Sequence, residues 1–115
     1  MYLLAATSVL IAGKYEEVDP PTIRDCMKIT HNKFNRNMIL EMELSILDSA
    51  EYGMLMTSSY RFLERWTKVA KSDQIIFNIA YFFLELALFD SKMSQYCPSL
   101  QAASALYTAM RLIVT

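Results

Sequence analysis

Apolar residues recur every three or four positions along most of the chain, which is the spacing of a buried helix face. This pattern predicts about six helices. They are expected at about 3–16, 21–29 and 35–49, from Thr57 or Ser58 onward, after Ser72 to about 89, and from Pro98 to the C-terminus. No stretch of convincing length alternates apolar and polar residues as a half-buried strand does. The predicted fold class is all-α, without a β-sheet.

Prolines and short polar residues predict where these helices begin and end. Pro20 and Pro21 stop the first helix and suit the first turn of the second, with Asp19 as its expected cap. Ser72 is the expected N-cap of the fifth helix. The segment 90–97 is expected to be irregular. The inward stripe of the fourth helix is predicted to hold Phe62, Trp66 and Val69 or Ala70.

The most apolar stretch runs from Ile75 to Phe89, with only Asn78 and Glu85 as clearly polar interior positions. A helix this apolar all round must be largely surrounded by protein. It is shorter than the ~20 residues needed to span a bilayer. The apolar stretch 1–13 lacks the basic start and cleavage site of a signal peptide. We therefore expect no membrane association.

Two alanine-rich stretches match in residue type, Ala5-Ala6-Thr7-Ser8-Val9 and Ala102-Ala103-Ser104-Ala105-Leu106. The match continues through Ala12 with Ala109 and Lys14 with Arg111, at a constant offset of 97 positions (Ala5 and Ala102). Chance can produce it, because tight helix packing selects small residues. Alternatively, each stretch is the central helix of a duplicated unit of about a hundred residues.

Composition narrows the range of functions. The chain has 115 residues, 54% of them hydrophobic, with Gly 2, Pro 3 and a net charge of -1. So balanced and scattered a charge argues against nucleic-acid binding. Cys26 and Cys97 are read as ordinary thiols of a reducing compartment. His31 lies at a predicted helix junction and suits a capping or solvent role. No metal-ligand or acid–base spacing emerges, so we do not expect an enzyme.

The segment from Leu10 to Pro21 reads Leu-Ile-Ala-Gly-Lys-Tyr-Glu-Glu-Val-Asp-Pro-Pro. It resembles the cyclin-box segment that joins the third and fourth helices, where lysine, an aromatic residue and two glutamates precede a proline pair. Gly13 departs from the serine that is usual there, a conservative change at a small-residue position.

Further segments are similar to A- and B-type cyclins in the same order. Residues 38–43 resemble the fifth helix of the first box, 60–65 and 84–90 the first two helices of the second box, and 98–103 the start of its third. The resemblance implies a cyclin-box-like helical bundle. It predicts residues 1–54 as the C-terminal half of the first box and 55–115 as the N-terminal half of the second. The two halves could also fold as one compact or swapped unit.

The resemblance implies a regulatory subunit that binds a cyclin-dependent protein kinase and positions its C-helix, activating it in cell-cycle control. It implies no cofactor. Lys14 and Glu43 would lie side by side and hydrogen-bond the kinase backbone, with apolar neighbours receiving the helix. The candidate kinase-binding residues are Lys14, Glu43, Tyr15, Glu16, Leu47, Tyr52 and Met54. Without the resemblance, the two charges would be solvated and Tyr15, Leu47 and Met54 ordinary core.

The same resemblance places the first two helices of the first box and the last two of the second outside the chain. Apolar faces of the first, fifth and sixth helices would then lack their usual cover. This predicts a homodimer, a domain-swapped oligomer or a rearranged bundle. The alternative function is a truncated helical interaction module that self-associates without activating a kinase. A transcription-factor core of related fold is disfavoured by the lack of a basic surface. Localisation to nucleus and cytoplasm follows from the family.

Overall fold

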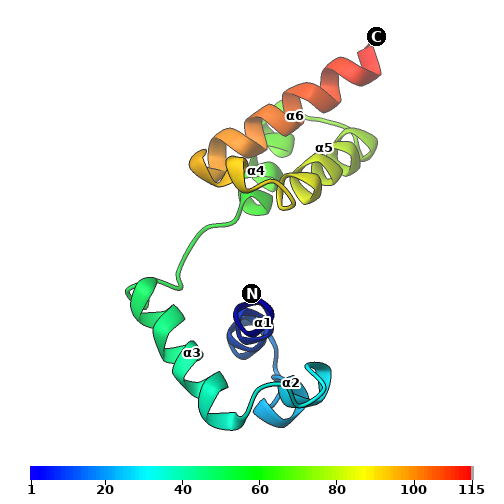
Figure 1. The fold of residues 1–115 in the computed structure, drawn as a ribbon. Coiled ribbons are helices and arrows are strands. Elements are labelled where there is room, and N and C mark those ends of the chain that lie inside the picture. Colours follow the sequence, from blue (N-terminus) through cyan, green and yellow to red (C-terminus); the bar gives the residue numbers. More distant parts are fainter. Residues whose placement is uncertain (115) are drawn as a thin grey trace. The chain divides into compact units, whose positions relative to one another are not determined.

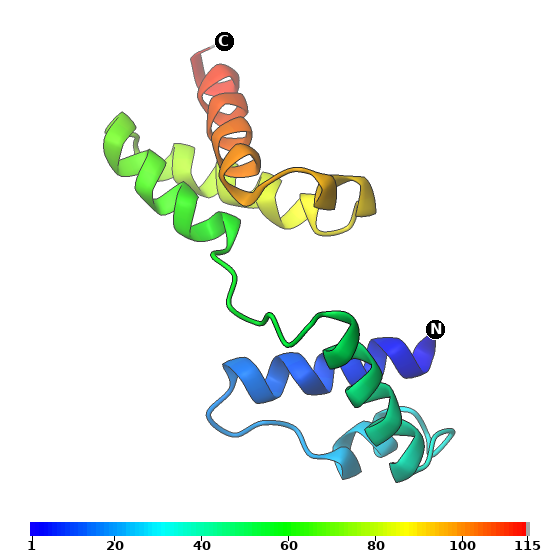
Figure 2. The same ribbon diagram turned by 90° about the vertical axis from the view of Figure 1, so that its left-hand side faces the viewer.

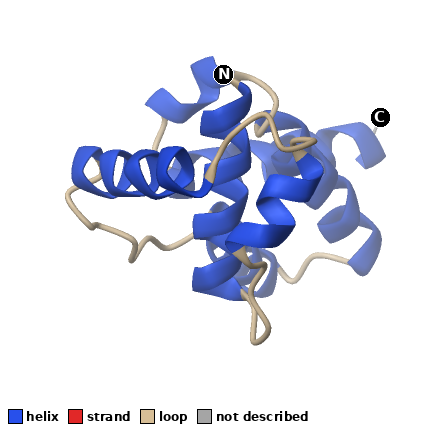
Figure 3. Cartoon of the chain, turned by 60° about the horizontal axis from the view of Figure 1, so that its bottom comes forward, coloured by secondary structure: helices blue, strands red, loops and turns tan. Residues whose placement is uncertain are grey.

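The computed structural model describes residues 1–114. They form six α-helices and one 3-10 helix, and no strand occurs among them (Figure 3). The elements are α1 (Tyr2–Glu16), α2 (Ile23–Ile29), α3 (Arg36–Ser49), α4 (Ser59–Ala70), α5 (Gln74–Ala87), η1 (Ser91–Gln95) and α6 (Pro98–Val114). The all-α prediction is confirmed.

The chain folds as two compact units, Met1–Met54 with α1 to α3 and Leu55–Thr115 with α4 to α6. In Figure 1 the first unit runs from blue to teal and the second from green to red. Each unit has a hydrophobic core of its own. The assignment of the two stretches to halves of two cyclin boxes stays a prediction.

The core of the first unit is small and is built by one residue from each helix. Leu10 of α1, Cys26 of α2 and Ile39 of α3 are buried together, and Leu3, Met27 and Phe34 are among the partly buried residues packed around them. Figure 2 shows α1 from the side, with α3 crossing it. Burial raises the pKa of the Cys26 thiol, so it stays protonated.

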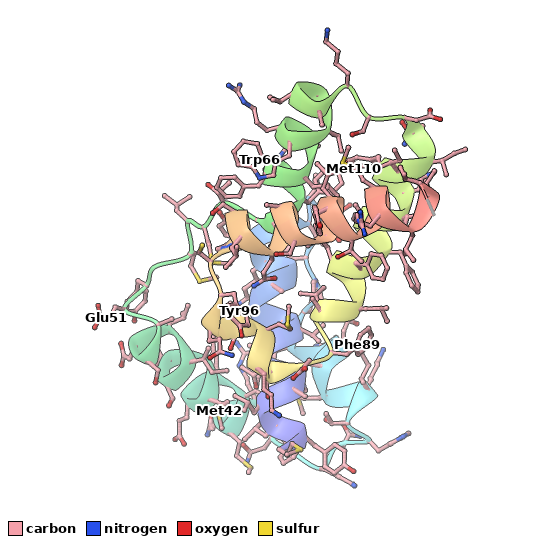
Figure 4. All side chains as sticks on the ribbon, turned by 90° about the horizontal axis from the view of Figure 1, so that it is seen from above. Met42, Glu51, Trp66, Phe89, Tyr96 and Met110 are labelled. Atoms are coloured by element: carbon pink, nitrogen blue, oxygen red, sulfur yellow. The ribbon has the colours of Figure 1, made fainter. Side chains whose placement is uncertain are left out.

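The core of the second unit is rich in alanine. Leu63 of α4 and Ala80 of α5 are fully buried against the alanines of α6, and Trp66 and Met110 pack against this cluster from α4 and α6 (Figure 4). Small residues at the contact allow helix backbones to approach closely. The long helix α6 thereby packs against both α4 and α5.

Two predicted caps are wrong. The cap of α2 is Thr22, whose hydroxyl accepts from the Asp25 N–H (3.2 Å) while the Asp25 carboxylate accepts from the Thr22 N–H (3.0 Å). This reciprocal capping box displaces Asp19, because the helix begins after the two prolines and not at them. The hydrogen bonds that the Thr22 N–H and the Thr22 hydroxyl group donate to the Asp25 carboxylate lower the pKa of Asp25. Asp73, which accepts from the Gln74 N–H at 2.7 Å, caps α5 in place of Ser72.

The structure also differs from the prediction in the burial of α4 and α5 and in the segment before α6. The inward side of α4 carries Leu63 and Thr67, with Phe62 and Trp66 partly buried, whereas Val69 is exposed. Ala70, the other expected position, is exposed as well. Within the unit only one side of α5 is covered, which contradicts the expectation that protein surrounds it. The segment expected to be irregular contains η1.

Gly13, in the last turn of α1, lies against the ring of Pro21. A Cβ added at Gly13 would lie 2.8 Å from Cγ of Pro21 and closer still to its Cδ. This chain therefore has no room at position 13 for the serine that is usual in the similar cyclin-box segment, because a proline ring cannot rotate away.

We expect Gly13→Ala to destabilise the first unit by about 1 kcal/mol. Alanine favours a helix by about 1 kcal/mol over glycine, but the clash costs about 1–3 kcal/mol. Chemical denaturation followed by circular dichroism measures the difference. In a Pro21→Ala background the ring is gone, and Gly13→Ala should become stabilising. A destabilisation of equal size in both backgrounds would contradict the steric explanation.

Candidate partner-binding surface

The ion pair between Lys14 and Glu43 links α1 to α3. Lys14 Nζ donates to Glu43 Oε1 at 2.6 Å, across 29 positions of sequence. Lys14 lies in the last turn of α1, and Glu43 lies in the middle of α3. The core contacts of Leu10 and Ile39 hold the two helices together. The side chains therefore meet because the helices that carry them are packed.

The two members of the pair differ in exposure. The Lys14 side chain is 46% exposed and that of Glu43 is 13% exposed. An ammonium group has three N–H donors. One of them reaches Glu43, so the exposed Lys14 can donate further to a bound partner. As a stabilising contact within the chain, a pair this exposed is worth about 0–1 kcal/mol.

Three of the other candidates lie together at the C-terminal end of α3. Leu47 follows Glu43 by one helical turn and is half-buried. The Tyr52 N–H donates to the Leu47 carbonyl at 3.0 Å, and the Met54 N–H donates to the Tyr52 carbonyl at 3.0 Å. Glu51 and Tyr52 take left-handed backbone angles that reverse the chain. Tyr52 is exposed and Met54 half-buried, so this end of α3 presents an aromatic and an aliphatic surface.

The phenol of Tyr52 is held by Asp48. The charge of the Asp48 carboxylate and its hydrogen bond with the phenol raise the pKa of Tyr52 above its usual range. The phenol is therefore protonated at neutral pH. Tyr52 can contact a partner with its ring while its hydroxyl group stays engaged.

Tyr15 and Glu16 extend from α1 directly after Lys14, and both are exposed. The Lys14–Glu43 pair joins this end of α1 to α3. Leu44, an exposed leucine next to Glu43 on α3, was not among the candidates. The available signal was its position, because Leu44 falls outside the helical stripe of Ile39 and Ile46 and so has no place in the core.

Other candidate chemistry is sparse in the part of the chain that the structure describes. His31 is exposed, in a left-handed conformation just after α2, and its N–H donates to the Lys28 carbonyl at 3.0 Å. Residues 1–114 contain no group of three or more histidine, cysteine, aspartate or glutamate side chains that could hold a metal ion. Among these residues no helix has the length and apolar character to cross a membrane.

Comparison with known families gives two adjacent matches. The cyclin N-terminal domain matches residues 1–55, and the cyclin C-terminal domain matches residues 57–115.

Similar proteins include plant B-type and mitotic cyclins. Cyclin-B1-3 of Arabidopsis thaliana is 40% identical over 109 residues, which are 95% of this chain and 26% of that protein. Cyclin-B2-1 of Oryza sativa subsp. japonica is 39% identical with the same coverage. The G2/mitotic-specific cyclin-2 of Medicago sativa is 37% identical over 95% of this chain and 33% of that protein. The chain spans about a quarter to a third of the length of these relatives.

Among solved structures, a viral cyclin from herpesvirus saimiri has a similar fold. The TM-score is 0.74 at 20% sequence identity, and the match covers 98% of this chain and 51% of the viral chain. This likeness shows a cyclin-box helical fold.

Proposed function

The chain belongs to the cyclin family, whose members are regulatory proteins and not enzymes, and we propose that it binds a cyclin-dependent protein kinase through the surface around Lys14 and Glu43. The observation that carries this proposal is the ion pair itself. The resemblance implies that two residues 29 positions apart act side by side, and their side-chain atoms lie 2.6 Å apart.

The chemistry of the surface supports contact with a helix of the partner. The donors of Lys14 and the oxygens of Glu43 suit the backbone groups at a helix end, which lack partners within the helix. Tyr15, which follows Lys14, and Leu44, which follows Glu43, offer exposed apolar area, as does Tyr52 just beyond the end of α3. Docking of the kinase C-helix here would complete the kinase's own Lys–Glu ion pair, which phosphoryl transfer requires. The cyclin would thus shift a two-state element of its partner.

We expect Lys14→Ala and Glu43→Ala each to weaken kinase binding by about tenfold. Each removes one member of a charge pair that becomes dehydrated at the interface, and tenfold corresponds to about 1.4 kcal/mol. The measurement is the dissociation constant for purified cyclin-dependent kinases, determined by biolayer interferometry with this chain immobilised. Lys28→Ala and Glu41→Ala are matched controls, since both side chains are exposed charges of the same unit. The controls should leave the dissociation constant within about twofold.

The double variant Lys14→Glu with Glu43→Lys separates a contact from a structural role. It restores an ion pair between α1 and α3 but exchanges the donor and the acceptor that face the kinase. If the pair contacts the kinase, the double variant should regain the free energy of unfolding that the single variants lose, but it should not regain kinase binding. Recovery of both would contradict the proposal and would make the pair a brace between two helices.

The second candidate function is a self-associating helical module that does not activate a kinase. Large apolar side chains that are exposed on α1 and α5, such as Val9 and Phe82, favour it. A homodimer or swapped oligomer that buries the surface around Lys14 would exclude kinase binding by the same chain. Light scattering with and without kinase distinguishes the two candidates. The kinase proposal includes localisation of this chain to the nucleus and cytoplasm.

A further inference from the structure

Helix α1 carries no charged side chain before Lys14, yet its own unit covers only one of its sides. No lysine, arginine, aspartate or glutamate occurs between Met1 and Lys14. Thr7, Leu10 and Ile11 are buried. The exposed positions on the opposite side of the helix are Ala5, Ser8, Val9 and Ala12. This side therefore presents apolar surface, most of it made of small residues, that nothing in the first unit covers.

Next to this side lies a groove between α1 and the end of α2. It has a volume of about 480 Å³, and we call it the α1 groove; its main apolar lining is Tyr2, Ala5, Val9, Ile29 and Phe34. Val9 is 64% exposed, and Ile29 is also exposed. The lining combines a small residue, Ala5, with larger ones such as Val9 and Ile29, and a row of bulky side chains can enter such a surface.

The similar helix α6 shows what such a face accepts. Ala5, Ser8, Val9 and Ala12 correspond, at the constant offset, to Ala102, Ala105, Leu106 and Ala109. All four residues of α6 are buried, and they pack on α4 and α5. The face that α1 exposes is thus the face that α6 buries. This chain therefore already pairs such an alanine-rich face with α5.

Helix α5 has a second, unused side. Ile75, Phe82 and Leu86 are exposed and lie seven and four residues apart, on one stripe of the helix. Phe89, just beyond the helix end, extends this row and is exposed at the edge of the unit (Figure 4). These four residues form what we call the α5 stripe. It lies opposite the buried Ala80 and Leu84, so it remains open when α6 is in place.

We propose that the chain self-associates by seating the α5 stripe of one copy in the α1 groove of a second copy. Bulky side chains of the stripe then meet the small residues of the groove, as knobs meet holes in packed helices. Few charges would be dehydrated, because α5 carries none from Gln74 to Leu84. Lys33 lines the groove and Glu85 flanks the stripe, so the charges near the two surfaces are opposite.

The two surfaces are different, so the contact is heterologous. Stable interfaces bury about 1,200–2,000 Å² in total, more than one row of four side chains provides. Every copy carries both a groove and a stripe, so one copy can contact neighbouring copies through both surfaces. The occupant that the geometry supports is thus a second copy of this chain, independent of any kinase contact.

Light scattering coupled to size-exclusion chromatography, over a range of concentrations, tests the proposal with the full chain. The wild type should associate, and Val9→Glu and Phe82→Lys should each raise the dissociation constant at least about tenfold. Both side chains are largely exposed, so the folds should persist, which circular dichroism verifies. Val69→Glu is the matched control, because this valine of α4 is 67% exposed and lies in neither surface.

Mixing the two variants is the decisive measurement. Between copies of the two variants, one kind of contact is native, and the other brings the glutamate introduced in the groove against the lysine introduced in the stripe, so association should return. A monomeric wild type overturns the proposal. So does an oligomer that either variant leaves unchanged, or that mixing does not restore, since α1–α1 and α5–α5 contacts predict no rescue.

Discussion

Replacing Leu63 by alanine is expected to lower the free energy of unfolding of the α4–α6 unit by about 2–5 kcal/mol. Leu63 is 0% exposed and lies among Ala80, Ala102 and Ala109. Alanines have no side-chain freedom with which to fill the vacated space. We therefore expect a loss in the upper part of that range.

Trp66 makes this loss measurable, because the chain's single tryptophan packs against the same core. Its fluorescence during urea denaturation should report an earlier midpoint for Leu63→Ala. Val69→Ala on the same helix is the control, because its side chain is exposed and should shift stability by no more than about 0.5 kcal/mol. Equal shifts for the two variants would show that Leu63 is not a core residue.

The second large effect is expected for Ile39→Ala in the α1–α3 unit, again a loss of about 2–5 kcal/mol. Ile39 is 0% exposed and packs with Leu10 and Cys26. A core with so few fully buried side chains contributes only a small free energy of unfolding, so the unit tolerates little further loss. We expect amide hydrogen exchange in α1 and α3 to accelerate strongly, with Leu44→Ala, an exposed leucine of α3, as the control.

The same variant tests whether the two compact units unfold separately. If they do, Ile39→Ala leaves the Trp66 transition within about 0.5 kcal/mol of its wild-type position, because Trp66 belongs to the other unit. A shift of the Trp66 transition equal to the loss in the first unit would mean that the chain unfolds as one cooperative body.

The number and approximate extent of the helices could be predicted from sequence because they depend on local information. The three- to four-residue spacing of apolar positions, two adjacent prolines and a few polar residues placed α1, α3 and α6 to within one or two positions. The caps depend on more than the local sequence. Several polar residues precede α2 and α5, and only the backbone angles decide which of them can reach the free N–H groups.

The candidate site depended on a resemblance. Nothing in the spacing of Lys14 and Glu43 relates them, because a contact across 29 positions forms only when α1 packs on α3. Likewise, the close approach of Pro21 to Gly13 could not be predicted from the amino-acid sequence, since it depends on the path of the loop between α1 and α2.

The sequence by itself determined the helices, the cyclin resemblance and the similarity between α1 and α6. Only the tertiary structure decided which sides those helices expose. Ala5 and Val9 correspond to Ala102 and Leu106, yet the first pair is open and the second is buried. The physical reason is that the burial of a helix face depends on which helices pack against it and not on its own residues. Helices α2 and α3 cover one side of α1, whereas α4 and α5 cover the side of α6 that corresponds to the exposed side of α1.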